Sequence, residues 1–401
     1  MICAPGFTTL AVAQQAPPGA ALETGDPRAD ARMRLGIFYL TPTLSIERVG
    51  LDSNVFTSGG EPKSDFTATM TPATTVWVPV ARRALLTAHL GVGLVYYKTF
   101  SNQRSVNPGV SARGELYARR LTFTVDAGTS SAHTQPNFEI DARVKHVNSN
   151  LGGGVRFQMQ RLSVEVSTYR QTTRFGDDAA FLGVSLRDTL DRAEQGMRLA
   201  VRERLTSLTT VGVIAETRQD RFERSPDRNA DGYRVAATID LAAKALISGS
   251  AEVGFRHLKP DNPMVPAFDG LVAKVAVGNN LGDSFQTRFG WDRDTHYSFD
   301  TSLPYYVSNA FSATLRRQVA GRFDAILGAS RSRATYRALA GAALVDGRRE
   351  ITMTYTVDVG YRVSRESRLG LAVSRINRTS SLADARQYGA TRAGLSFNYG
   401  F

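Results

Sequence analysis

The chain has 401 residues, with 49 lysines and arginines against 37 acidic residues and a formal net charge of +12. The arginines are scattered rather than clustered on one element, which argues against nucleic acid as a partner and leaves anionic lipid head groups or acidic solutes. No apolar run reaches the roughly 18 residues of a membrane-spanning helix, but strands can also cross a membrane. The 35 glycines and 15 prolines fit many turns and little helix.

The first 33 residues precede any strand pattern. Leu10-Ala11-Val12-Ala13 predicts cleavage of a signal peptide after Ala13, so residues 1–13 are interpreted as its remnant, with a disordered N-terminus as the alternative. The missing basic region suggests a truncated start. Residues 14–33, rich in Ala, Pro, Gln and Asp, predict a disordered periplasmic lead-in. Cleavage would remove Cys3, the one cysteine of the chain.

From residue 34 onward, apolar and polar residues alternate over long stretches. Clear examples are residues 86–96, 121–128, 151–159 and 351–363. Period-2 alternation is the pattern of a strand with one apolar and one polar face. These stretches run to about 10 to 16 residues, long for soluble strands but suited to tilted membrane strands.

Short turns and longer polar loops alternate along this region. The short turns are expected near Arg82-Arg83, Arg119-Arg120, Gln160-Arg161, Arg202-Glu203, Ala243-Lys244, Asn280-Leu281, Ala320-Gly321 and Arg365-Glu366. The longer loops are expected at residues 49–64, 100–105, 134–141, 175–188, 220–231, 258–267, 299–305, 337–348 and 379–386. Eight turns between nine hairpins predict an all-β fold: one transmembrane antiparallel barrel of about 18 strands over residues 34–401, with short periplasmic turns and longer extracellular loops. A β-propeller or tandem sandwiches would also supply many strands but would not explain outward apolar faces. No loop looks like an obvious inward constriction.

The polar face of these strands carries charges of both signs. Such charges would be prohibitive in a soluble core but cost little in a wide, wet lumen. Asp240, Lys274 and Asp324 share this face. The pore-lining candidates are Arg113, Glu115, Arg156, Glu165, Glu194, Arg198, Glu216, Arg234, Glu252, Arg256, Arg288, Asp292, Arg316, Asp358, Arg362 and Arg392.

Two motifs could carry chemistry, and both have a simpler interpretation. His133 and His146 flank one loop with Glu139 and Asp141, so a catalytic dyad at the rim is conceivable, although solvated loop residues are favoured. We expect no enzyme and no cofactor.

Asp227, Asn229 and Asp231, followed by Gly232, match the start of a calcium loop. Its twelfth position is Thr238 rather than Glu, so an Asp- and Asn-rich turn is favoured and no metal site is expected.

The last strand ends on aromatic residues. Ala393, Leu395, Phe397, Tyr399 and Phe401 fall on one face. This resembles the terminal strand of bacterial outer-membrane barrels, and the resemblance implies that Phe397, Tyr399 and Phe401 form the signal read by the barrel-assembly machinery. A sandwich edge strand is the alternative.

Residues 34–44, Asp52 with Asn54, and Met70-Thr71-Pro72 resemble the opening of the putative β-barrel porin-2 family. Gly50-Leu51 departs from it, because an aromatic residue commonly precedes the Asp-x-Asn pair. The resemblance implies an outer-membrane channel, a passive conduit in exopolysaccharide or capsule export. Its partners would be outer-membrane lipid, lipopolysaccharide and periplasmic export components. A general diffusion porin and a structural or adhesive barrel remain open.

Overall fold

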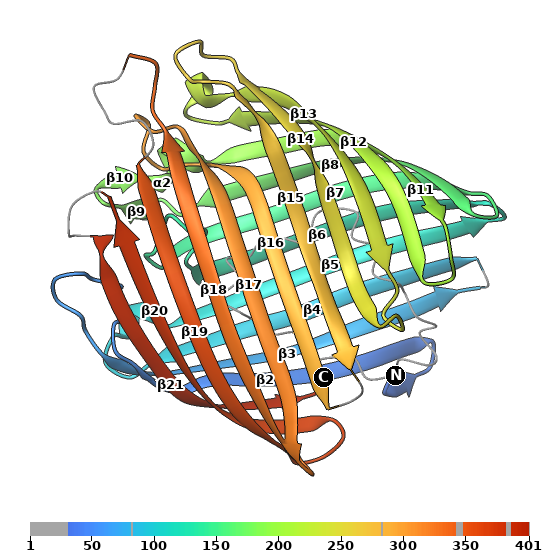
Figure 1. The fold of residues 1–401 in the computed structure, drawn as a ribbon, viewed down its shortest axis with the longest axis horizontal. Coiled ribbons are helices and arrows are strands. Elements are labelled where there is room, and N and C mark those ends of the chain that lie inside the picture. Colours follow the sequence, from blue (N-terminus) through green and yellow to red (C-terminus); the bar gives the residue numbers. More distant parts are fainter. Residues whose placement is uncertain (1–30, 82, 282–283, 342–347, 382–385, 401) are drawn as a thin grey trace.

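The computed structural model shows a closed antiparallel barrel of 18 strands, and it describes residues 31–81, 83–281, 284–341, 348–381 and 386–400 (Figure 1). The predicted fold is confirmed. The expected signal-peptide remnant, most of the lead-in, and Phe401 lie outside the described residues. The barrel strands are β2 (Phe38–Asp52), β3 (Asp65–Val80), β4 (Ala84–Tyr97), β5 (Ser105–Ala118), β6 (Leu121–Thr134), β7 (Val144–Gln158), β8 (Leu162–Phe175), β11 (Arg192–Arg204), β12 (Thr209–Phe222), β13 (Ala230–Leu241), β14 (Ile247–Pro260), β15 (Phe268–Leu281), β16 (Phe285–Tyr297), β17 (Tyr305–Ala320), β18 (Phe323–Arg337), β19 (Arg349–Arg362), β20 (Ser367–Ser380) and β21 (Tyr388–Tyr399).

Each strand pairs with its neighbours in sequence, and β2 pairs with β21 to close the ring. The closing ladder runs from Leu44 opposite Tyr399 to Asp52 opposite Arg392, and the register shifts between Ile46 and Val49. The Arg392 Nε donates to Asp52 Oδ2 at 2.7 Å across this junction. Closure removes the exposed edges that an open sheet would have.

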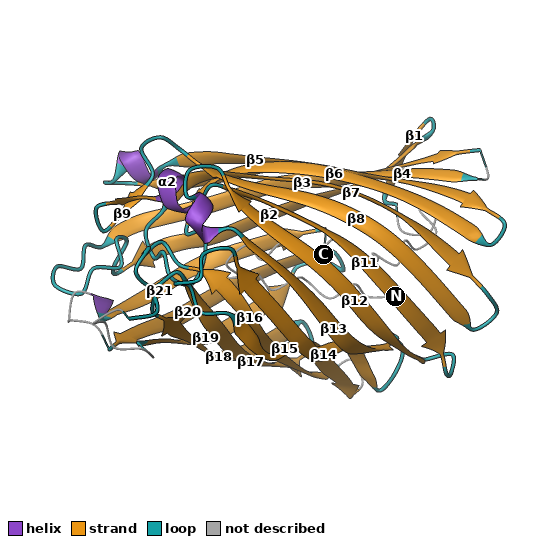
Figure 2. Cartoon of the chain, turned by 90° about the horizontal axis from the view of Figure 1, so that it is seen from above, coloured by secondary structure: helices purple, strands orange, loops and turns teal. Residues whose placement is uncertain are grey.

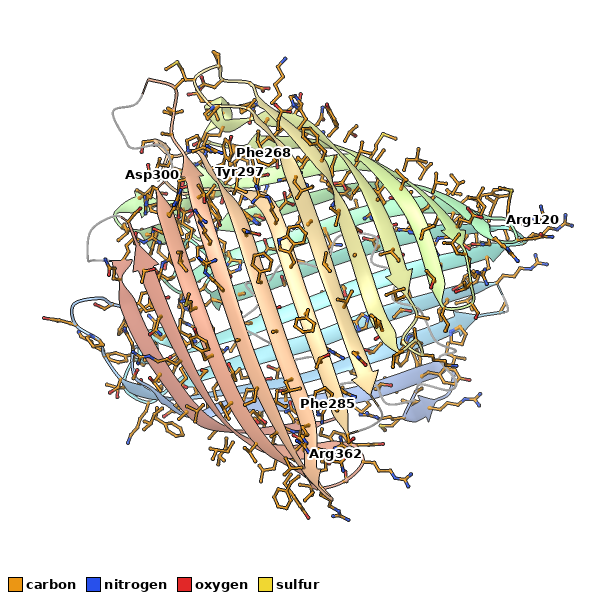
Figure 3. The ribbon with its side chains drawn as sticks, viewed as in Figure 1. Arg120, Phe268, Phe285, Tyr297, Asp300 and Arg362 are labelled. Carbon is orange, nitrogen blue, oxygen red and sulfur yellow. The ribbon has the colours of Figure 1, made fainter. Side chains whose placement is uncertain are left out.

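The strand ends that flank the eight expected short turns lie at one end of the barrel, here called the turn end, and the strand ends that flank the nine longer loops lie at the other, here called the loop end (Figure 2). Figure 3 shows Arg120, Phe285 and Arg362 near the turn end, and Phe268, Tyr297 and Asp300 near the loop end. Two turns are displaced from their expected positions. Arg202-Glu203 still belongs to β11 and Asn280-Leu281 to β15, so these turns come a few residues later.

The outer wall of the barrel is apolar. Val359 and Leu371, on neighbouring strands, are 50% and 55% exposed, and Phe289, Leu271 and Tyr355 are similarly exposed. Along β19 and β20 such residues alternate with inward polar ones, as the sequence pattern predicts. An apolar band of this kind is the surface that a barrel presents to lipid.

The remaining elements are short. A β1 strand (Met33–Leu35) pairs with the start of β2, and the loop after β8 carries β9 (Ala180–Phe181), β10 (Val184–Ser185) and α2 (Leu186–Leu190). The Ser185 Oγ caps α2 by accepting the Asp188 N–H. Single 3-10 turns are η1 (Ser101–Gln103) and η2 (Pro226–Arg228). None of the helices in the described ranges is long and apolar enough to span a membrane.

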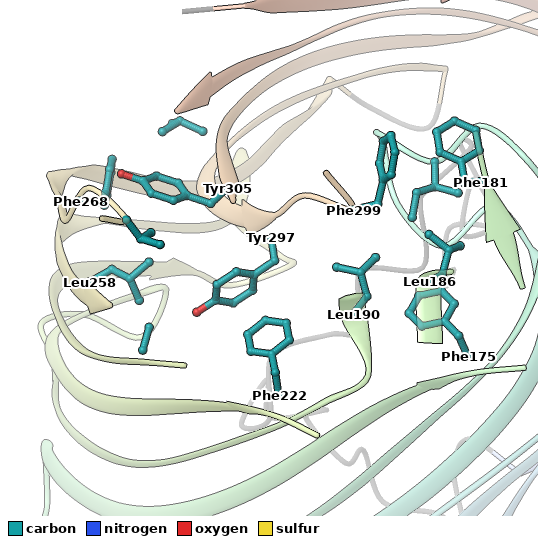
Figure 4. Close-up of a cluster of buried hydrophobic side chains, with 14 of the residues drawn as sticks. Phe175, Phe181, Leu186, Leu190, Phe222, Leu258, Phe268, Tyr297, Phe299 and Tyr305 are labelled. Atoms are coloured by element: carbon teal, nitrogen blue, oxygen red, sulfur yellow. The ribbon is translucent and has the colours of Figure 1, made fainter. Parts of the chain in front are cut away.

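Apolar packing is concentrated at the loop end. Leu186, Leu190 and Phe299 come from loops and are nearly inaccessible, and they pack with side chains from the ends of strands such as Phe222 and Tyr297 (Figure 4). Burial of these side chains holds the loops against one another and over the mouth of the barrel.

Candidate functional site

The interior of the barrel holds a cavity of about 1070 Å³. Inward-facing residues of β8 and β11–β14 line one side, and those of β17–β20 line another. Residues 135–138, Asp141 and Arg143 of the loop between β6 and β7 also line it, so this loop bounds the cavity toward the loop end.

The side formed by β8 and β11–β14, here the charged wall, is a network of ion pairs. Strand register sets Arg198 opposite Glu216, and Glu216 opposite Arg234. The Arg234 guanidinium binds Glu216 at 2.9 Å and Glu252 at 3.2 Å, and Arg198 reaches the same Glu252 at 3.2 Å. Cross-strand pairs of opposite charge stabilise a sheet and fix its side chains.

The network continues toward the loop end through a tyrosine. The Tyr169 hydroxyl contacts Glu216 at 2.9 Å and Glu194 at 3.2 Å. Arg218 then bridges Glu194 and Asp220, at 2.8 Å to each. The cations and carboxylates of the charged wall are therefore largely matched.

The side formed by β17–β20, here the hydroxyl wall, has a different chemistry. Its middle is made of small and hydroxyl-bearing side chains rather than charges. Those that line the cavity are Ser308, Ser312, Thr314, Ser330, Ser332, Thr352, Thr354, Thr356 and Ser374. Each hydroxyl can both donate and accept a hydrogen bond, and it rotates to suit its partner.

An arginine–carboxylate cluster lies at the turn end of the hydroxyl wall. Asp324 is inaccessible to solvent and accepts from Arg368 at 2.6 Å and from Arg316 at 3.0 Å, with Arg362 at 3.9 Å. Arg368 also pairs with Asp358. The cluster gathers three of the predicted pore-lining residues, Arg316, Asp358 and Arg362, around one buried carboxylate.

A second cluster closes the loop end of the same wall, and it centres on Glu350. This inaccessible carboxylate accepts from Arg348 at 2.6 Å, from Arg386 at 2.7 Å and from the Tyr336 hydroxyl at 3.0 Å, and it also pairs with Arg378. Sequence reasoning missed this cluster because Arg348 and Arg386 were assigned to loops, and Glu350 and Arg378 lay outside the alternating stretches that it used. Extending the alternation of β19 and β20 by two residues toward the loop end would have predicted that Glu350 and Arg378 face inward.

The loop of residues 135–143 lines the cavity and folds into the mouth, although no loop looked like an obvious inward constriction from the sequence. Its own Asn137 shapes it, because the Asn137 Oδ1 accepts the N–H groups of Glu139 and Ile140 at 2.9 and 2.8 Å. The Glu139 carboxylate then reaches the loop after β16, where it accepts from Ser298 Oγ at 2.6 Å and from Phe299 N at 3.0 Å.

The same loop is also tied to the far end of the hydroxyl wall. Arg378 donates to the Phe138 carbonyl at 2.8 Å and pairs with Asp141 at 3.4 Å, and Arg386 donates to the Glu139 carbonyl at 2.5 Å. The loop leaves the barrel between β6 and β7, so these contacts carry it across the mouth.

Burial has the largest effect on the pKa of Glu139, the carboxylate that joins this loop to the loop after β16. It raises the pKa of Glu139 from the ordinary 4.5 to about 7, although the hydrogen bonds from Ser298 and Phe299 and the charge of Arg386 act in the opposite direction. Burial likewise lowers the pKa of Arg228, in the loop after β12, to about 10. Arg228 ties three loops together by donating to the carbonyls of Thr189, Ser298 and Pro304.

The predicted pore-lining residues fall into two groups. Those that line the cavity are Glu194, Arg198, Glu216, Arg234, Glu252, Arg256, Asp292, Asp358 and Arg392. Of the others, Arg156 and Glu165 pair at 2.8 Å, while Arg113 and Glu115 lie on the face of β5 opposite the exposed Val110 and Leu116. Arg288 is exposed.

The structure does not assemble the rim dyad. His133 lies opposite Lys145 and His146 opposite Ala132, so the two rings project to opposite faces of the wall. One nitrogen of each ring instead contacts a backbone carbonyl: His133 Nε2 contacts that of Arg143, and His146 Nδ1 that of Val144.

Two residues of the calcium-loop motif, Asn229 and Asp231, form contacts within the protein instead. The Asn229 Oδ1 accepts the Phe222 N–H at 2.8 Å, and Asp231 pairs with Arg221 at 2.6 Å on the barrel wall. In the described part of the chain, no group of three or more His, Cys, Asp or Glu side chains is placed to hold a metal ion.

The family described as "Putative beta-barrel porin 2" matches residues 26–399. The chain belongs to this family. This barrel porin is accordingly a porin-like channel of the bacterial outer membrane. No curated protein matches the chain.

Several solved structures are similar to the chain, at low identity. The outer membrane protein OpdK of Pseudomonas aeruginosa is 11% identical, with 90% of this chain and 98% of that chain covered and a TM-score of 0.48. The siderophore receptor PirA of Acinetobacter baumannii is 8% identical, with 90% and 80% covered and a TM-score of 0.44. At such identities and scores the likeness carries no argument about what this barrel porin transports.

Proposed function

We propose that this barrel porin conducts an acidic polysaccharide across the outer membrane. The observation that carries the proposal is the two-sided lumen, in which a wall of hydroxyls faces a wall rich in arginines. Sugar hydroxyls can exchange water for Ser and Thr hydroxyls with little net change in hydrogen bonding, and this suits passage rather than tight binding. Carboxylates on the polymer would be attracted by guanidinium groups, which bind carboxylates with two parallel hydrogen bonds.

The ion pairs within the charged wall favour passage of an acidic polymer over its tight binding. Arg198 and Arg234 already have carboxylate partners, so an incoming acidic sugar competes with Glu216 and Glu252 rather than meeting free cations. The partners follow from this proposal: outer-membrane lipid and lipopolysaccharide around the wall, the barrel-assembly machinery during insertion, and periplasmic polysaccharide-export components below the turn end.

Conductance across a planar bilayer tests the proposal. The refolded protein should show stable open steps that an acidic oligosaccharide blocks in a concentration-dependent manner, and a neutral oligosaccharide of equal length should block them more weakly. Steps that neither sugar affects would overturn the assignment of a sugar conduit. Blockade that is equal for both sugars would remove the requirement for acidic groups.

A general diffusion porin is the second candidate, and the inward loop of residues 135–143 favours it. Such a loop narrows a pore and sets a size limit for solutes. Swelling of proteoliposomes in sugars of graded size would show a sharp size limit that is independent of charge if this function is the correct one.

A further inference from the structure

Strand β2 contains a β-bulge that places an extra residue, Arg48, in the barrel wall. Three steps along β2, from Ile46 to Val49, match only two steps along β21, and the ladder with β3 shifts in the same way between Glu47 and Gly50. No described residue of β3 or β21 lies opposite Arg48, and its φ is 56°. Such a left-handed conformation is unfavourable for a residue with a side chain, and bulges redirect side chains, so the fold accepts strain to direct this arginine.

Neighbouring groups hold the bulge in place. The Thr67 Oγ1 donates to the Arg48 carbonyl at 3.2 Å. On the other side, a Cβ on Gly394 would lie only 3.2 Å from the carbonyl carbon of Arg48, and a Cβ on Gly50 would overlap the Ala393 carbonyl. The two glycines therefore let β2 and β21 approach closely at the bulge.

A row of short residues crosses the inner wall beside the bulge. Tyr97 of β4 lies opposite Thr67 of β3, and its neighbour Tyr96 is exposed on the outer wall, so Tyr97 faces the lumen. Thr67 lies opposite Gly50 of β2, which in turn lies opposite Gly394 of β21 (Figure 1). Three strand spacings of about 4.8 Å separate Tyr97 from Gly394, so the row is about 14 Å long. Because one threonine and two glycines follow the tyrosine, the row forms a recess in the wall.

Three arginines surround this recess. Arg48 stands beside it at the bulge, and Arg392 lies two residues from Gly394 on the same face of β21, about 7 Å away along the strand. Arg143 comes from the loop that folds into the mouth, and its guanidinium carbon lies 5.3 Å from the centre of the Tyr97 ring. All three arginines line the cavity. The name arginine recess is used below for Arg48, Thr67, Tyr97, Arg143 and Arg392.

Carboxylates do not fully match the cations of the arginine recess. The Arg392 Nε donates to Asp52 at 2.7 Å, but the Arg392 Nη1 and the Arg143 Nε are buried without a hydrogen-bond partner among the described residues. Arg48 forms no ion pair with any described residue, although the charges of Glu47 and Asp52 lie near its guanidinium. Three guanidinium groups therefore share two carboxylates, which leaves one positive charge in excess.

The groups around the arginine recess leave this excess in place. The nearby carboxylate of Asp141 is taken by Arg378, at 3.4 Å. Burial lowers the pKa of Arg143, and the charge of Arg392 acts in the same direction, although the Tyr97 hydroxyl opposes both. Arg143 and Arg392 thus lie close enough to repel each other, and an anion between them would relieve the repulsion.

We propose that the arginine recess binds one carboxylate group of a sugar acid. The carboxylate would lie among Arg48, Arg143 and Arg392, and its single charge would balance the excess. Guanidinium groups bind carboxylates through parallel hydrogen bonds, and Arg48 is exposed to the lumen and available for them. The hydroxyls of Thr67 and Tyr97 suit a hydroxylated ligand, and the glycines leave room for a sugar ring.

The site does not depend on passage of a polymer through the barrel. Its carboxylate can belong to a free sugar acid or to an acidic residue of a polysaccharide, and both present the same group. Thermal unfolding of the refolded full-length protein tests binding, because a ligand of the folded state raises the melting temperature in a saturable manner. At constant ionic strength D-glucuronate should do so, its uncharged methyl ester should not, and the dianion sulfate should do so more weakly.

Replacement of Arg48 locates the site. Arg48→Gln removes one charge-assisted hydrogen bond, so the dissociation constant for glucuronate should rise about tenfold or more. Arg288→Gln is the matched control, because it removes the same charge at an exposed position on β16, and it should leave the dissociation constant unchanged. Arg48→Gly should also weaken binding, but it should raise the melting temperature of the ligand-free protein because glycine accepts the positive φ.

Four results would overturn the proposal or one of its parts. A dissociation constant that Arg48→Gln leaves unchanged would overturn the site, and a lower melting temperature in Arg48→Gly would show that the arginine supports the bulge rather than a ligand. Equal stabilisation by the methyl ester would overturn the carboxylate, and equal stabilisation by sulfate would overturn the match to a single charge.

An oligomer of glucuronate distinguishes the two sources of the carboxylate. Tighter binding of the oligomer than of the monomer would assign the group to a polymer, and equal binding would assign it to a free acid. Blockade of ionic current by an acidic oligosaccharide that persists in Arg48→Gln would leave polysaccharide conduction standing without this site. Failure of the site and failure of conduction therefore give different results.

Discussion

The charged wall and the hydroxyl wall face the same lumen but differ in how their polar groups are held. On the charged wall Glu216 has fixed partners in Arg234 and Tyr169, so its orientation is set by the protein. On the hydroxyl wall Ser330 and Thr354 carry small groups that can turn toward whatever passes. The difference indicates that one wall supplies rigidity and an electrostatic pattern, and the other supplies adaptable contacts.

The largest expected effect comes from removing a carboxylate of the charged wall. Glu216→Ala leaves Arg234 and the Tyr169 hydroxyl without this partner in a half-buried site, and we expect the free energy of unfolding to fall by about 3 kcal/mol. Thr354→Ala, on the hydroxyl wall, should cost about 1 kcal/mol or less. Urea unfolding in lipid vesicles measures both. Equal losses would show that the two walls do not differ in rigidity.

Ion selectivity and stability should respond differently to replacement of an exposed arginine, Arg288, and of a paired one, Arg198. Arg288→Glu changes an exposed charge, so it should lower the anion preference with little loss of stability. Arg198→Glu places a second carboxylate beside Glu252, so it should destabilise the barrel by about 2 kcal/mol or more. Reversal potentials in a salt gradient, together with unfolding curves, give the two readouts. Unchanged selectivity in the double variant would count against both arginines as determinants of selectivity.

Sugar blockade probes the hydroxyl wall. The triple variant Ser312→Ala, Ser330→Ala, Thr354→Val removes three hydroxyls, each worth about 0.5–1.5 kcal/mol if a sugar bonds to it. Blockade by an oligosaccharide should weaken several-fold while ionic conductance stays nearly constant. Thr129→Val, a similar change at an exposed position that contacts Ser149, should leave blockade unaltered. A triple variant that blocks as well as the parent protein would assign recognition of sugars to the charged wall.

A smaller effect is expected from pH, through Glu139. Its pKa is raised to about 7 in the docked loop, so docking is strongest below about pH 4.5 and weakens as pH rises through about 7. Closures in single-channel recordings should become rarer between about pH 5 and about pH 8. Glu139→Gln, which mimics the protonated acid, should be insensitive to pH over this window. A parent channel with no pH dependence would indicate that the loop stays docked in both protonation states.

The smallest expected effect is that of calcium. Because Asp231 pairs with Arg221 and Asn229 binds the backbone, millimolar calcium should leave the melting temperature unchanged. A rise in the melting temperature that Asp227→Ala abolishes would restore the calcium-loop interpretation.

The architecture could be predicted from the sequence because alternation encodes which face each residue takes. The inward placement of Glu216 and the outward placement of Val359 both follow from period 2. The direction of the loop at residues 135–143 could not be predicted, because it depends on Asn137 bonding its own backbone and on contacts from β20. The early end of the ladder between β15 and β16, at Ala273 opposite Arg293, could not be predicted either, because residues 268–272 have the composition of an ordinary strand.

The junction of β2 with β21 has a consequence for how the barrel forms. Asp52 and Arg392 meet across 340 positions of the chain, so the contact that completes the ring carries a large loop-closure entropy and should form late. Until then the folding sheet has two unpaired edges and an apolar face, which are the features that drive aggregation. The barrel is therefore most prone to aggregation before the ring closes, and a folding factor that covers the edge of β2 until β21 pairs with it would reduce that aggregation.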